Sequence, residues 1–377
     1  MTIRILDSLD SIAAADWNRL AGDNPFLCHA FLDGLHTTGC AAPKTGWEPR
    51  FITLWEHGHL TGALPLYLKH HSYGEYVFDW AWADAYQRLG HAYYPKLLGA
   101  VPFTPVTGPR LLAASAERRT ELVTAALALA KESGVSSLHV LFPPASEAAE
   151  LERQGLMLRH GVQFHWSNPG YRDFNDFLAT LSHDKRKKIK QERRKQTDAG
   201  VSFTHLAGAA IQESDWDFFM ACYQRTYQLH HSTPYLNREF FLHLGERMRD
   251  NVLLIVATQD GDPIASALNI YSAHALYGRY WGSLRYVPGL HFETCYYQGI
   301  EFCIAQNIPL FEGGAQGEHK LARGLLPQRT VSAHWLAHPE FAEAVTRFLR
   351  KETNGIEDYV DELSEHSPFK QDQPAAE

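Results

Sequence analysis

Residues 276–335 read LYGRYWGSLRYVPGLHFETCYYQGIEFCIAQNIPLFEGGAQGEHKLARGLLPQRTVSAHW, and this stretch decides the fold. A β-prone run, Ala275–Trp281, passes through a Pro-Gly loop into a long amphipathic helix that begins near His291. The helix leads to a short apolar strand, Pro309–Phe311, which delivers the segment Glu312–Lys320. That segment places three glycines beside ionisable side chains, which are costly to bury unless they pair or react. We expect it to form a wall of the active site.

Length and composition indicate a two-domain globular protein. The 377 residues exceed one ordinary core, and 45% hydrophobic with 21% charged residues is typical of globular chains. The formal charge of 35 − 43 = −8 argues against a protein devoted as a whole to nucleic acid. The five cysteines show no CxxC spacing, so disulfides and a structural zinc are not expected and a reducing compartment is favoured.

The sequence shows no targeting segment and no membrane-spanning segment. The first residues, MTIRILDSLDSIAAADW, lack the apolar region of a secretory signal. No run approaches the roughly 18 apolar residues that a spanning helix needs. No HExxH pattern or Cys/His spacing indicates a metal site. We therefore expect a cytoplasmic protein without a metal.

The two halves of the chain predict the same order of elements: a strand, two helices, three strands, a helix and a further strand. In the first half the third of the three strands is Tyr76–Trp80, and a turn at 168–170 marks the boundary. The predicted domains are residues 1–168 and 169–366, followed by a disordered tail at 367–377. The repeated order indicates a structural duplication.

A concentrated run of positive charge, HDKRKKIKQERRK at residues 183–195, opens the second half. It carries eight Lys and Arg against Asp184 and Glu192, and Ser182 is a suitable N-cap for a helix. The side chains with the reach to contact phosphates are Lys185, Arg186, Lys188, Lys190, Arg193 and Arg194. The alternative is a solvated helix face. Base-reading aromatic modules are absent, so any nucleic-acid contact would be to a phosphate backbone, and DNA is not an expected partner.

The order of elements resembles the GNAT acyltransferase fold, and two such units in tandem, the second opened by a basic helix, resemble the FemAB family of aminoacyltransferases. The segments that carry the resemblance are GWEP, PLYLKHHSYGEYVFDWAWADAY, YYPKLLGAVPFTPVTGPRLL, LSHDKRKKIKQERR, GRYWGS, LHFETCYYQGIEF and FEGGAQGEHKLARGLLP. They are similar to a FemAB-like bacterial family of predicted acyltransferases that carries a peptidoglycan biosynthesis or recognition label. The resemblance implies an α/β fold with mixed sheets of the α+β kind, built from two tandem GNAT-like domains.

The resemblance also implies the reactants. Characterised FemAB relatives take an aminoacyl-tRNA as acyl donor and an amine on a cell-wall precursor as acceptor. More distant GNAT enzymes use acyl-CoA and hold its pyrophosphate on backbone N–H groups in a turn of the pattern [RQ]xxGx[GA]. Here the turn reads Arg285-Tyr286-Val287-Pro288-Gly289-Leu290, so Arg285 and Gly289 would bind CoA. Pro288 replaces a glycine and removes one N–H, which makes CoA the weaker expectation.

Acyl transfer to an amine needs a proton acceptor, a polarised carbonyl and a proton for the leaving group. Glu312, at a strand end beside two glycines, is the predicted base; the alternative is a Glu paired with a neighbouring Lys or Arg. Lys320 and Arg323 are three residues apart on a predicted short helix and would share one face to bind a phosphate or an oxyanion. For them the alternative is a solvated turn. Gln316 and His319 lie in the same segment and are assigned to substrate binding and to catalysis.

Residues on the preceding strand and helix complete the predicted site. Arg279 and Tyr280 are neighbours on a strand, so alternation predicts that only one of them faces the cleft, where Arg279 would bind substrate. Tyr280 is a candidate donor of the leaving-group proton, as is the pair Tyr296–Tyr297, although packing in the core is the commoner role of a tyrosine. His291 and Glu293, at the start of the helix, are either a helix cap or substrate ligands.

Three functions remain open at this stage. The leading one is transfer of an aminoacyl or acyl group to the amine of a small molecule or peptide, such as a cell-wall precursor. The second is an acyl-CoA-dependent GNAT enzyme that acylates a small amine. The third is a non-catalytic protein that binds a cell-wall precursor or tRNA.

Overall fold

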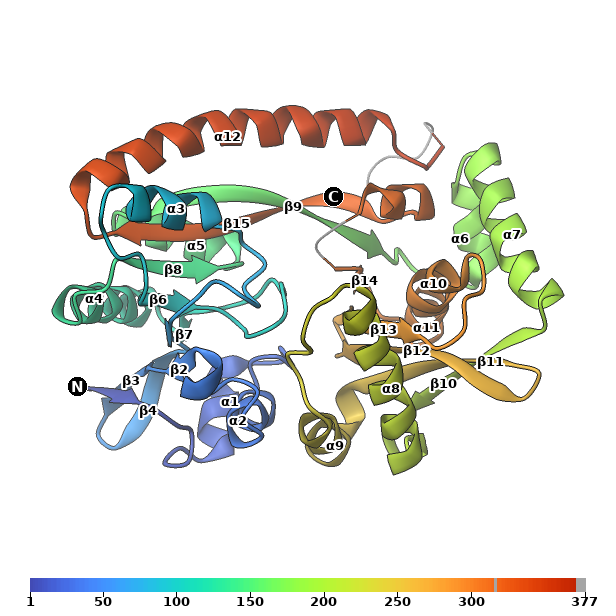
Figure 1. Cartoon of the computed structure of the whole chain (residues 1–377), viewed down its shortest axis with the longest axis horizontal. Coiled ribbons are helices and arrows are strands. Elements are labelled where there is room, and N and C mark those ends of the chain that lie inside the picture. The colour runs from blue at the N-terminus through green and yellow to red at the C-terminus, as the bar shows by residue number, and fades with distance from the viewer. Residues whose placement is uncertain (315–316, 371–377) are drawn as a thin grey trace. The chain divides into compact units, whose positions relative to one another are not determined.

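The structure, a computed structural model, describes residues 1–314 and 317–370. Its chain divides into two compact units (Figure 1). Unit 1 comprises Met1–Gly161 and Arg329–Asp358. Unit 2 comprises Val162–Gln328 and Tyr359–Glu377, of which residues up to 370 are described. Each unit combines β-sheet with helices and has a hydrophobic core of its own.

Unit 1 contains two sheets. An antiparallel sheet has the order β1-β3-β4-β7, and a mixed sheet runs β2-β5-β6-β8-β15 with β6 parallel to β8. The strands are β1 (Thr2–Leu6), β2 (Trp47–Pro49), β3 (Phe51–Glu56), β4 (His59–Leu64), β5 (Tyr67–Lys69), β6 (Lys96–Gly99), β7 (Leu112–Ala113), β8 (Ser137–Leu141) and β15 (Leu326–Leu336). The helices are α1 (Ala14–Ala21), α2 (His29–Thr37), α3 (Trp80–Arg88), α4 (Ala116–Glu132), α5 (Ala145–Arg153) and the start of α12 (Pro339–Glu365).

Local sequence explains the best-defined elements of unit 1. The hairpin between β3 and β4 turns at His57 and Gly58, which both have positive φ (50° and 85°), as a two-residue turn between twisted strands requires. Ser115 caps α4, because its hydroxyl accepts a hydrogen bond from the Arg118 amide at 3.3 Å. The buried face of α4, with Leu122 and Ala126, closes the core over the strands.

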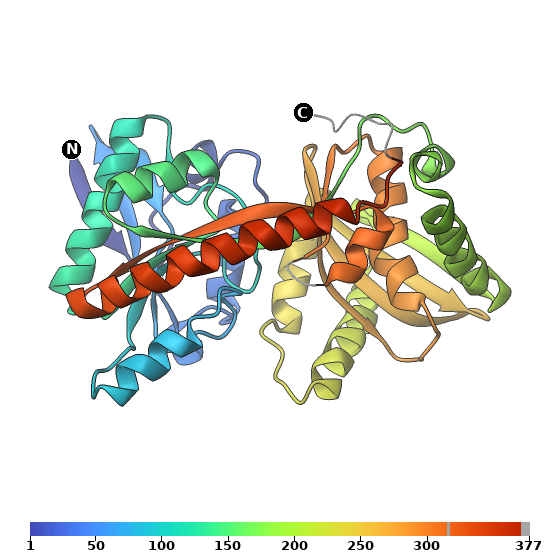
Figure 2. The same cartoon turned by 90° about the horizontal axis from the view of Figure 1, so that it is seen from above.

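Unit 2 is built on the strand order β10-β11-β12-β13-β14-β9. β13 and β14 are parallel, and the other neighbouring pairs are antiparallel. The strands are β9 (Met157–Ser167), whose first residues belong to unit 1, β10 (Val201–Ala207), β11 (Val252–Gln259), β12 (Asp262–Tyr271), β13 (Ala275–Ser283) and β14 (Leu310–Glu312). The helices are α6 (Phe174–Thr180), α7 (His183–Asp198), α8 (Glu213–Leu229), α9 (Arg238–Arg247), α10 (Leu290–Phe292) and α11 (Gln298–Ala305). Helices α6 and α7 lie side by side in both views (Figures 1 and 2).

Two close packing contacts fix the helix 290–305 and strand β13 in unit 2. A π-helical turn, Glu293–Tyr297, joins α10 to α11, so residues 290–305 form one helix with a wide turn in it. This helix buries Tyr297 and Ile300 in the core of the unit. On β13, a Cβ atom at Gly282 would lie 1.9 Å from the carbonyl oxygen of Cys222 on α8. Glycine is therefore required where α8 meets the sheet.

The predicted strand Tyr76–Trp80 is wrong. Trp80 begins α3, Tyr76 has a φ of 64°, and the segment before the helix is irregular. The buried ammonium group of Lys96 explains the difference, because it draws in the carboxylates of Glu75 at 2.7 Å and Asp79 at 2.5 Å. Residues four apart in a regular strand lie about 13 Å from each other, too far for both carboxylates to reach one ammonium group, so the segment cannot stay extended.

The C-terminal part of the chain is divided differently from the predicted boundaries. Residues 329–358 belong to unit 1, whereas the sequence assigned 169–366 to one domain. The reason is strand pairing: Ser332–Leu336 of β15 is antiparallel to Ser137–Leu141 of β8.

The predicted disordered tail is wrong for residues 367–370. The Ser182 amide donates to the Pro368 carbonyl at 2.9 Å, and the Lys370 amide donates to the Thr180 carbonyl at 3.0 Å. Phe369 forms a β-bridge with Leu181 and packs against the core of unit 2. An aromatic residue that reaches an apolar surface is held there, despite the polar residues around it. The rest of the predicted tail, residues 371–377, lies outside the described residues.

Candidate active site

Strands β13 and β14 separate soon after they meet, and a cavity forms where they part. The described pairing ends with Tyr277 opposite Glu312, after which the amide of Gly313 donates to Phe164 of β9 at 3.3 Å. The cavity has a volume of about 110 Å³. It is lined by Ala267, Leu268, Asn269, Gly278, Arg279, Tyr280, Trp281, His291, Cys295, Tyr296 and Gly313.

A β-bulge shapes the floor of this cavity. In the pairing of β12 with β13, Leu268 lies opposite Tyr280 and Asn269 lies opposite Gly278, so Arg279 is the extra residue. As a result Arg279 and Tyr280 both line the cavity. The prediction that only one of them faces the cleft relied on regular alternation, which this bulge breaks, and the ring of Tyr280 also packs edge-on against Tyr223 of α8, with the centroids 5.2 Å apart.

Asn269 was missed by the sequence reasoning. It is 1% exposed, and its Nδ2 has no hydrogen-bond partner among the described residues. A buried amide without a partner is costly, so its N–H is available to an oxygen of a ligand in the cavity. The available signal was one amide side chain in the apolar run ASALNIY.

Glu312 is buried beside Arg279. Nη2 of Arg279 lies 3.4 Å from Oε2 of Glu312, and both side chains are about 5% exposed or less. Burial raises the pKa of Tyr277 to about 12, and the Glu312 charge adds to the rise. Glu312 therefore acts in this structure as the counter-charge of Arg279, which was the alternative that the sequence left open.

Lys320 lies behind the Gly313–Gly314 turn. Its side chain is 3% exposed, and Nζ donates to the carbonyl of Gly314 at 2.8 Å. Burial, aided by the charge of Arg279, lowers the pKa of Lys320 to about 8. About one tenth of its amine is therefore unprotonated at pH 7, compared with less than about one part in a thousand for an ordinary lysine, and only the unprotonated form can accept a proton.

Tyr296 connects the cavity to His319. The Tyr296 hydroxyl and His319 Nε2 are 3.1 Å apart, and His319 is exposed to solvent. Burial lowers the pKa of His291 to about 4, and it lowers that of His319 as well. Both imidazoles are thus neutral at physiological pH, and Tyr296 with His319 can carry a proton between cavity and solvent.

Arg323 is held away from the cavity. Its guanidinium lies 3.0 Å from the Glu192 carboxylate, donates to the His319 carbonyl at 2.7 Å and stacks over Phe292. The hydroxyl of Tyr297 also donates to Glu192. Arg323 and Lys320 therefore contact different partners and do not form the predicted shared binding face. Both side chains are buried, so the alternative of a solvated turn does not hold either.

In the turn that would hold CoA, three backbone N–H groups already donate hydrogen bonds within the protein. The amides of Leu290 and Phe292 donate to the carbonyls of Val287 and Gly289, and the Glu293 amide also donates to the Gly289 carbonyl. Gly289 has a φ of 83°, and a Cβ atom there would lie 3.1 Å from Nε2 of Gln196. The Arg285 side chain is directed to Gln259 and Asp262. Neither Arg285 nor Gly289 lines the cavity.

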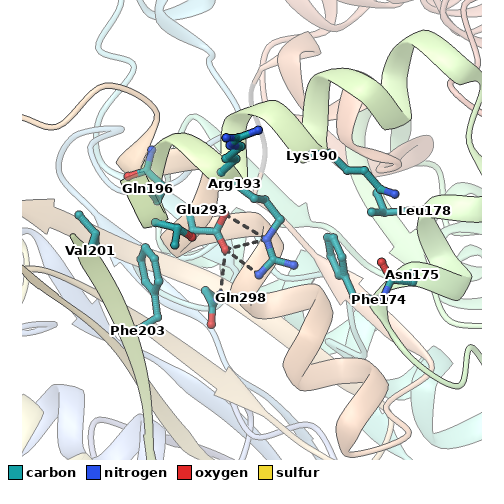
Figure 3. Close-up of a pocket in the computed structure, with 12 residues that line it drawn as sticks. Phe174, Asn175, Leu178, Lys190, Arg193, Gln196, Val201, Phe203, Glu293 and Gln298 are labelled. Atoms are coloured by element: carbon teal, nitrogen blue, oxygen red, sulfur yellow. Dashed lines mark hydrogen bonds and ion pairs between the residues drawn. The ribbon is translucent and has the colours of Figure 1, made fainter. Parts of the chain in front are cut away.

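The basic helix α7 presents two kinds of cation. Arg193 forms ion pairs with two carboxylates of the helix 290–305, at 3.0 Å from Glu293 and 2.8 Å from Glu301. Arg194 lies 3.5 Å from Asp198. Glu293 is 3% exposed, so Arg193 neutralises a buried carboxylate, as Figure 3 shows. The other six of its eight cations form no ion pair with a described carboxylate, and these are Lys185, Arg186, Lys187, Lys188, Lys190 and Lys195.

The structure thus gathers part of the predicted site. Arg279, Tyr280 and His291 line one cavity, with Glu312, His319 and Lys320 around it. Glu293, Arg323, Arg193, Lys190, Lys185 and Arg186 lie elsewhere in unit 2, and Gln316 is outside the described residues. Within the described ranges, no three His, Cys, Asp or Glu side chains converge as a metal site would require. No helix in the described chain is both long and apolar enough to cross a membrane.

A sequence profile of the FemAB-like family, described as peptidoglycan biosynthesis/recognition, matches residues 8–371. The chain belongs to the FemAB-like family. The resemblance seen in its motifs is thereby confirmed. No curated protein is similar enough to count as a match.

Solved structures share the FemAB-like fold of this chain. FemX is 9% identical with a TM-score of 0.58 over 92% of this chain and 100% of its own. The L-PGS of Bacillus licheniformis is 11% identical with a TM-score of 0.57 over 92% and 99%. The C-terminal domain of a putative lysylphosphatidylglycerol synthetase from Agrobacterium fabrum is 10% identical with a TM-score of 0.52 over 88% and 94%. The predicted fold class, mixed α/β with tandem GNAT-like units, is confirmed.

Proposed function

We propose that this FemAB-like protein transfers an aminoacyl group from an aminoacyl-tRNA to an amine on a cell-wall precursor, in the cavity of unit 2. The family description, peptidoglycan biosynthesis/recognition, supports the acceptor. The observation that carries the proposal is the cavity itself, which joins an unpartnered buried amide, an arginine and a tyrosine–histidine pair.

In the proposed reaction the acceptor amine attacks the carbonyl carbon of the aminoacyl ester. A C–N bond forms, the ester C–O bond breaks, and the 3′-oxygen of the RNA leaves. The amine gives up one proton and the leaving oxygen takes one up, so the overall transfer releases no proton. Protein groups are therefore needed to stabilise the developing oxyanion and to move protons.

Asn269 and Arg279 are suited to the oxyanion. The Nδ2 of Asn269 is the unpartnered donor of the cavity, and Arg279 lines it with a positive charge whose orientation Glu312 holds. Donors fixed before the reaction stabilise developing charge without reorganisation, and removal of one costs about 10²–10³ in rate.

Lys320 is suited to accept the proton of the acceptor amine. With a pKa of about 8, the amine of Lys320 is mostly unprotonated above that pH. The Glu312 carboxylate, in contrast, forms an ion pair with the guanidinium of Arg279. Glu312 as the base stays a prediction and is the alternative to Lys320. The leaving oxygen would be protonated through Tyr296 and His319, with Tyr280 as the other candidate.

The basic helix α7 supports an RNA donor. Six cations without an ion-pair partner among the described carboxylates give it an attraction for a phosphate backbone that needs no base recognition. For an acyl-CoA donor, held by Arg285 and Gly289, the turn offers little support, because Pro288 has no N–H and three amides are used internally.

The test is amide formation measured by mass spectrometry, with aminoacyl-tRNA or acyl-CoA as donor and a nucleotide-sugar peptide as acceptor. We expect product with aminoacyl-tRNA, and a loss of about 10²–10³ in rate for Asn269→Leu, which keeps the shape and removes the donor. Ser266→Ala is the matched control, since Ser266 is buried on the same strand and does not line the cavity. Product with acyl-CoA only, or tight precursor binding without any product, contradicts the proposal.

A further inference from the structure

A second pocket lies on another face of the helix 290–305. It is a groove of about 300 Å³ between α6, α7 and β10 (Figure 3). Glu293 and Gln298 form its inner wall, whereas His291, Cys295 and Tyr296 of the same helix line the acyl-transfer cavity. The volume is at the lower end of the range for small-molecule pockets, roughly 300–1,000 Å³. Nothing in the proposed transfer reaction uses this groove.

The charge of the groove favours an anion. Arg193 is neutralised by Glu293 and Glu301. Lys190 has no ion-pair partner among the described carboxylates, and Arg194 pairs at 3.5 Å with the exposed Asp198. Lys190 is thus the unpaired cation at the edge of the groove for a phosphate or carboxylate, and Arg194 adds a second charge if it exchanges the exposed Asp198 for the ligand.

The inner wall of the groove offers an oxygen that can accept a hydrogen bond from a neutral N–H group. Gln196 is 2% exposed and donates through Nε2 to the carbonyl of Pro288 at 2.8 Å, whereas its Oε1 has no hydrogen-bond partner in the described chain. The nearby carboxylate of Glu293 already accepts from Arg193 and Gln298. A ligand N–H would satisfy the amide oxygen of Gln196.

The remaining wall is apolar and partly aromatic. Phe203 stands beside Val201 and Gln298, and Phe174 and Leu178 lie opposite, on α6 (Figure 3). The guanidinium of Arg193 covers one face of Phe174 at 4.4 Å, which leaves Phe203 as the ring for contact with a ligand. An aromatic ring beside cations is the combination that holds an unpaired base and its phosphate.

We propose that this groove binds a nucleoside phosphate. The base would lie against Phe203 with its exocyclic amine on Gln196 Oε1, and the phosphate would meet Lys190 and Arg194. A fatty acid would leave Gln196 unsatisfied, and the ammonium group of an amino acid would find the groove carboxylate of Glu293 already paired with Arg193. The nucleotide is either a free mononucleotide or an unpaired nucleotide of an RNA; the second source rests on the proposed function.

Calorimetric titration of the full chain with AMP, CMP, GMP and UMP tests the inference, with no transfer reaction involved. We expect at least one of them to bind, and Lys190→Ala to weaken binding at least about fivefold, because one charge-assisted contact is lost. Lys131→Ala is the matched control, an exposed lysine of α4 in unit 1 outside the groove, with an expected change of less than about twofold. Phe203→Leu should also weaken binding about fivefold or more while the thermal unfolding curve shows a folded protein.

Two outcomes overturn the inference: no nucleotide binds at millimolar concentration, or Lys190→Ala and Lys131→Ala weaken binding equally. Titration with a single-stranded RNA trinucleotide distinguishes the two sources of the nucleotide. At least about tenfold tighter binding than the mononucleotide supports an RNA source, and equal binding supports a free nucleotide. Because binding is measured alone, its failure is separate from any failure of acyl transfer.

Discussion

Glu312 and Lys320 offer two opposite environments for a proton acceptor in unit 2. The carboxylate of Glu312 lies 3.4 Å from the guanidinium of Arg279 and forms a buried ion pair with it. The amine of Lys320 is buried beside a positive charge, which favours release of a proton. The proposed mechanism therefore gives proton transfer to Lys320 and the orientation of Arg279 to Glu312.

This assignment predicts the pH dependence of transfer. The rate should rise up to a midpoint near pH 8, the pKa of Lys320, and level off above it, because only the neutral amine accepts a proton. Lys320→Arg should lower the rate about 10²–10⁴-fold, and Glu312→Gln should lower it less while the midpoint stays. The matched control is Lys187→Arg. Loss of activity in Glu312→Gln together with an unchanged Lys320→Arg would return the role of base to Glu312.

Two buried histidines of unit 1 predict how its stability depends on pH. Nδ1 of His139 and Nδ1 of His334 are 2.7 Å apart, and each side chain is 1% exposed. Burial lowers the pKa of His139 to about 3 and that of His334 well below its usual value. The unfolded chain binds protons at both sites below about pH 6.5 and the folded unit does not. The contribution of these histidines to the free energy of unfolding is therefore fully present above about pH 6.5. It is lost as the pH falls, by up to about 1.4 kcal/mol per pH unit for each histidine.

Urea titrations at pH 7 and pH 5 check this prediction. Glu75 acts in the opposite sense, because burial raises its pKa to about 7 and the folded state gains its proton as the pH falls. The comparison is therefore between the wild type and His334→Gln, whose loss of stability between the two pH values should be smaller by about 1–2 kcal/mol. In the folded wild type, NMR resonances of both imidazoles should not titrate above pH 5, and a midpoint near 6.5 would contradict the account.

The residues of the site were only partly predictable from the sequence. Glu312, Lys320 and His319 stand out because ionisable groups gather beside glycines. The place of Asn269, Arg279 and Tyr280 along the cavity depends on a bulge, and a bulge is decided by the pairing of β12 with β13. Which cation is paired, as with Arg193 and Arg323, depends on carboxylates about a hundred residues or more away in the chain.

At the scale of elements, helix α7 is the part most clearly built for an external partner. Its cations without an internal partner contribute little to stability and much to the surface potential. Replacing Lys185, Arg186 and Lys187 by Ala should lower the slope of log affinity against log salt for tRNA by about 2–3, roughly 0.7–0.9 for each cation. Thermal unfolding should be almost unchanged. Filter binding between 50 and 200 mM salt, about the range in which such contacts weaken, provides the measurement.

The control for α7 is a triple variant that makes the same change of charge in unit 1. Lys131, Arg350 and Lys351 are exposed there and belong to other helices. Their replacement by Ala should leave the salt slope unchanged within about half a unit. An equal fall in slope for both triple variants would mean that the net charge of the protein, and not α7, attracts the RNA.

Long periodic helices and alternating strands were predictable, and irregular segments were not. Helices α8 and α4 have 17 residues each and begin after a polar residue, so period and cap point to the same helix in the sequence. Tyr76–Trp80 has the composition of a strand but is bent by buried ion pairs. The π-helical turn at Glu293–Tyr297 left no signal in the apolar pattern of the helix.

At the scale of the whole molecule, the two units use their ionisable groups differently. In unit 1, Lys96, Glu75 and Asp79 are fully buried and bind one another. In unit 2, Asn269 and Arg279 line a cavity. The duplication inferred from the repeated order of elements thus carries different chemistry in its two copies, which is why we place acyl transfer in unit 2.

The C-terminal segment should stabilise unit 2. Truncation after His366 removes the contacts of Pro368 and Phe369 and should lower the free energy of unfolding by up to about 2 kcal/mol. Truncation after Lys370 keeps these contacts and is the control. Hydrogen exchange resolves the effect by unit: amides around Leu181 should exchange faster, and those of β8 should not. Equal exchange in the two truncated proteins would contradict a stabilising role.

Photocrosslinking with an aminoacyl-tRNA that carries a photoreactive amino acid tests the central claim most directly. It reports where the acyl group lies, independently of turnover. The account predicts crosslinked peptides from the cavity of unit 2, containing Tyr280, Trp281 or Tyr296, and their loss when unlabelled aminoacyl-tRNA competes. Crosslinks confined to unit 1 would contradict it.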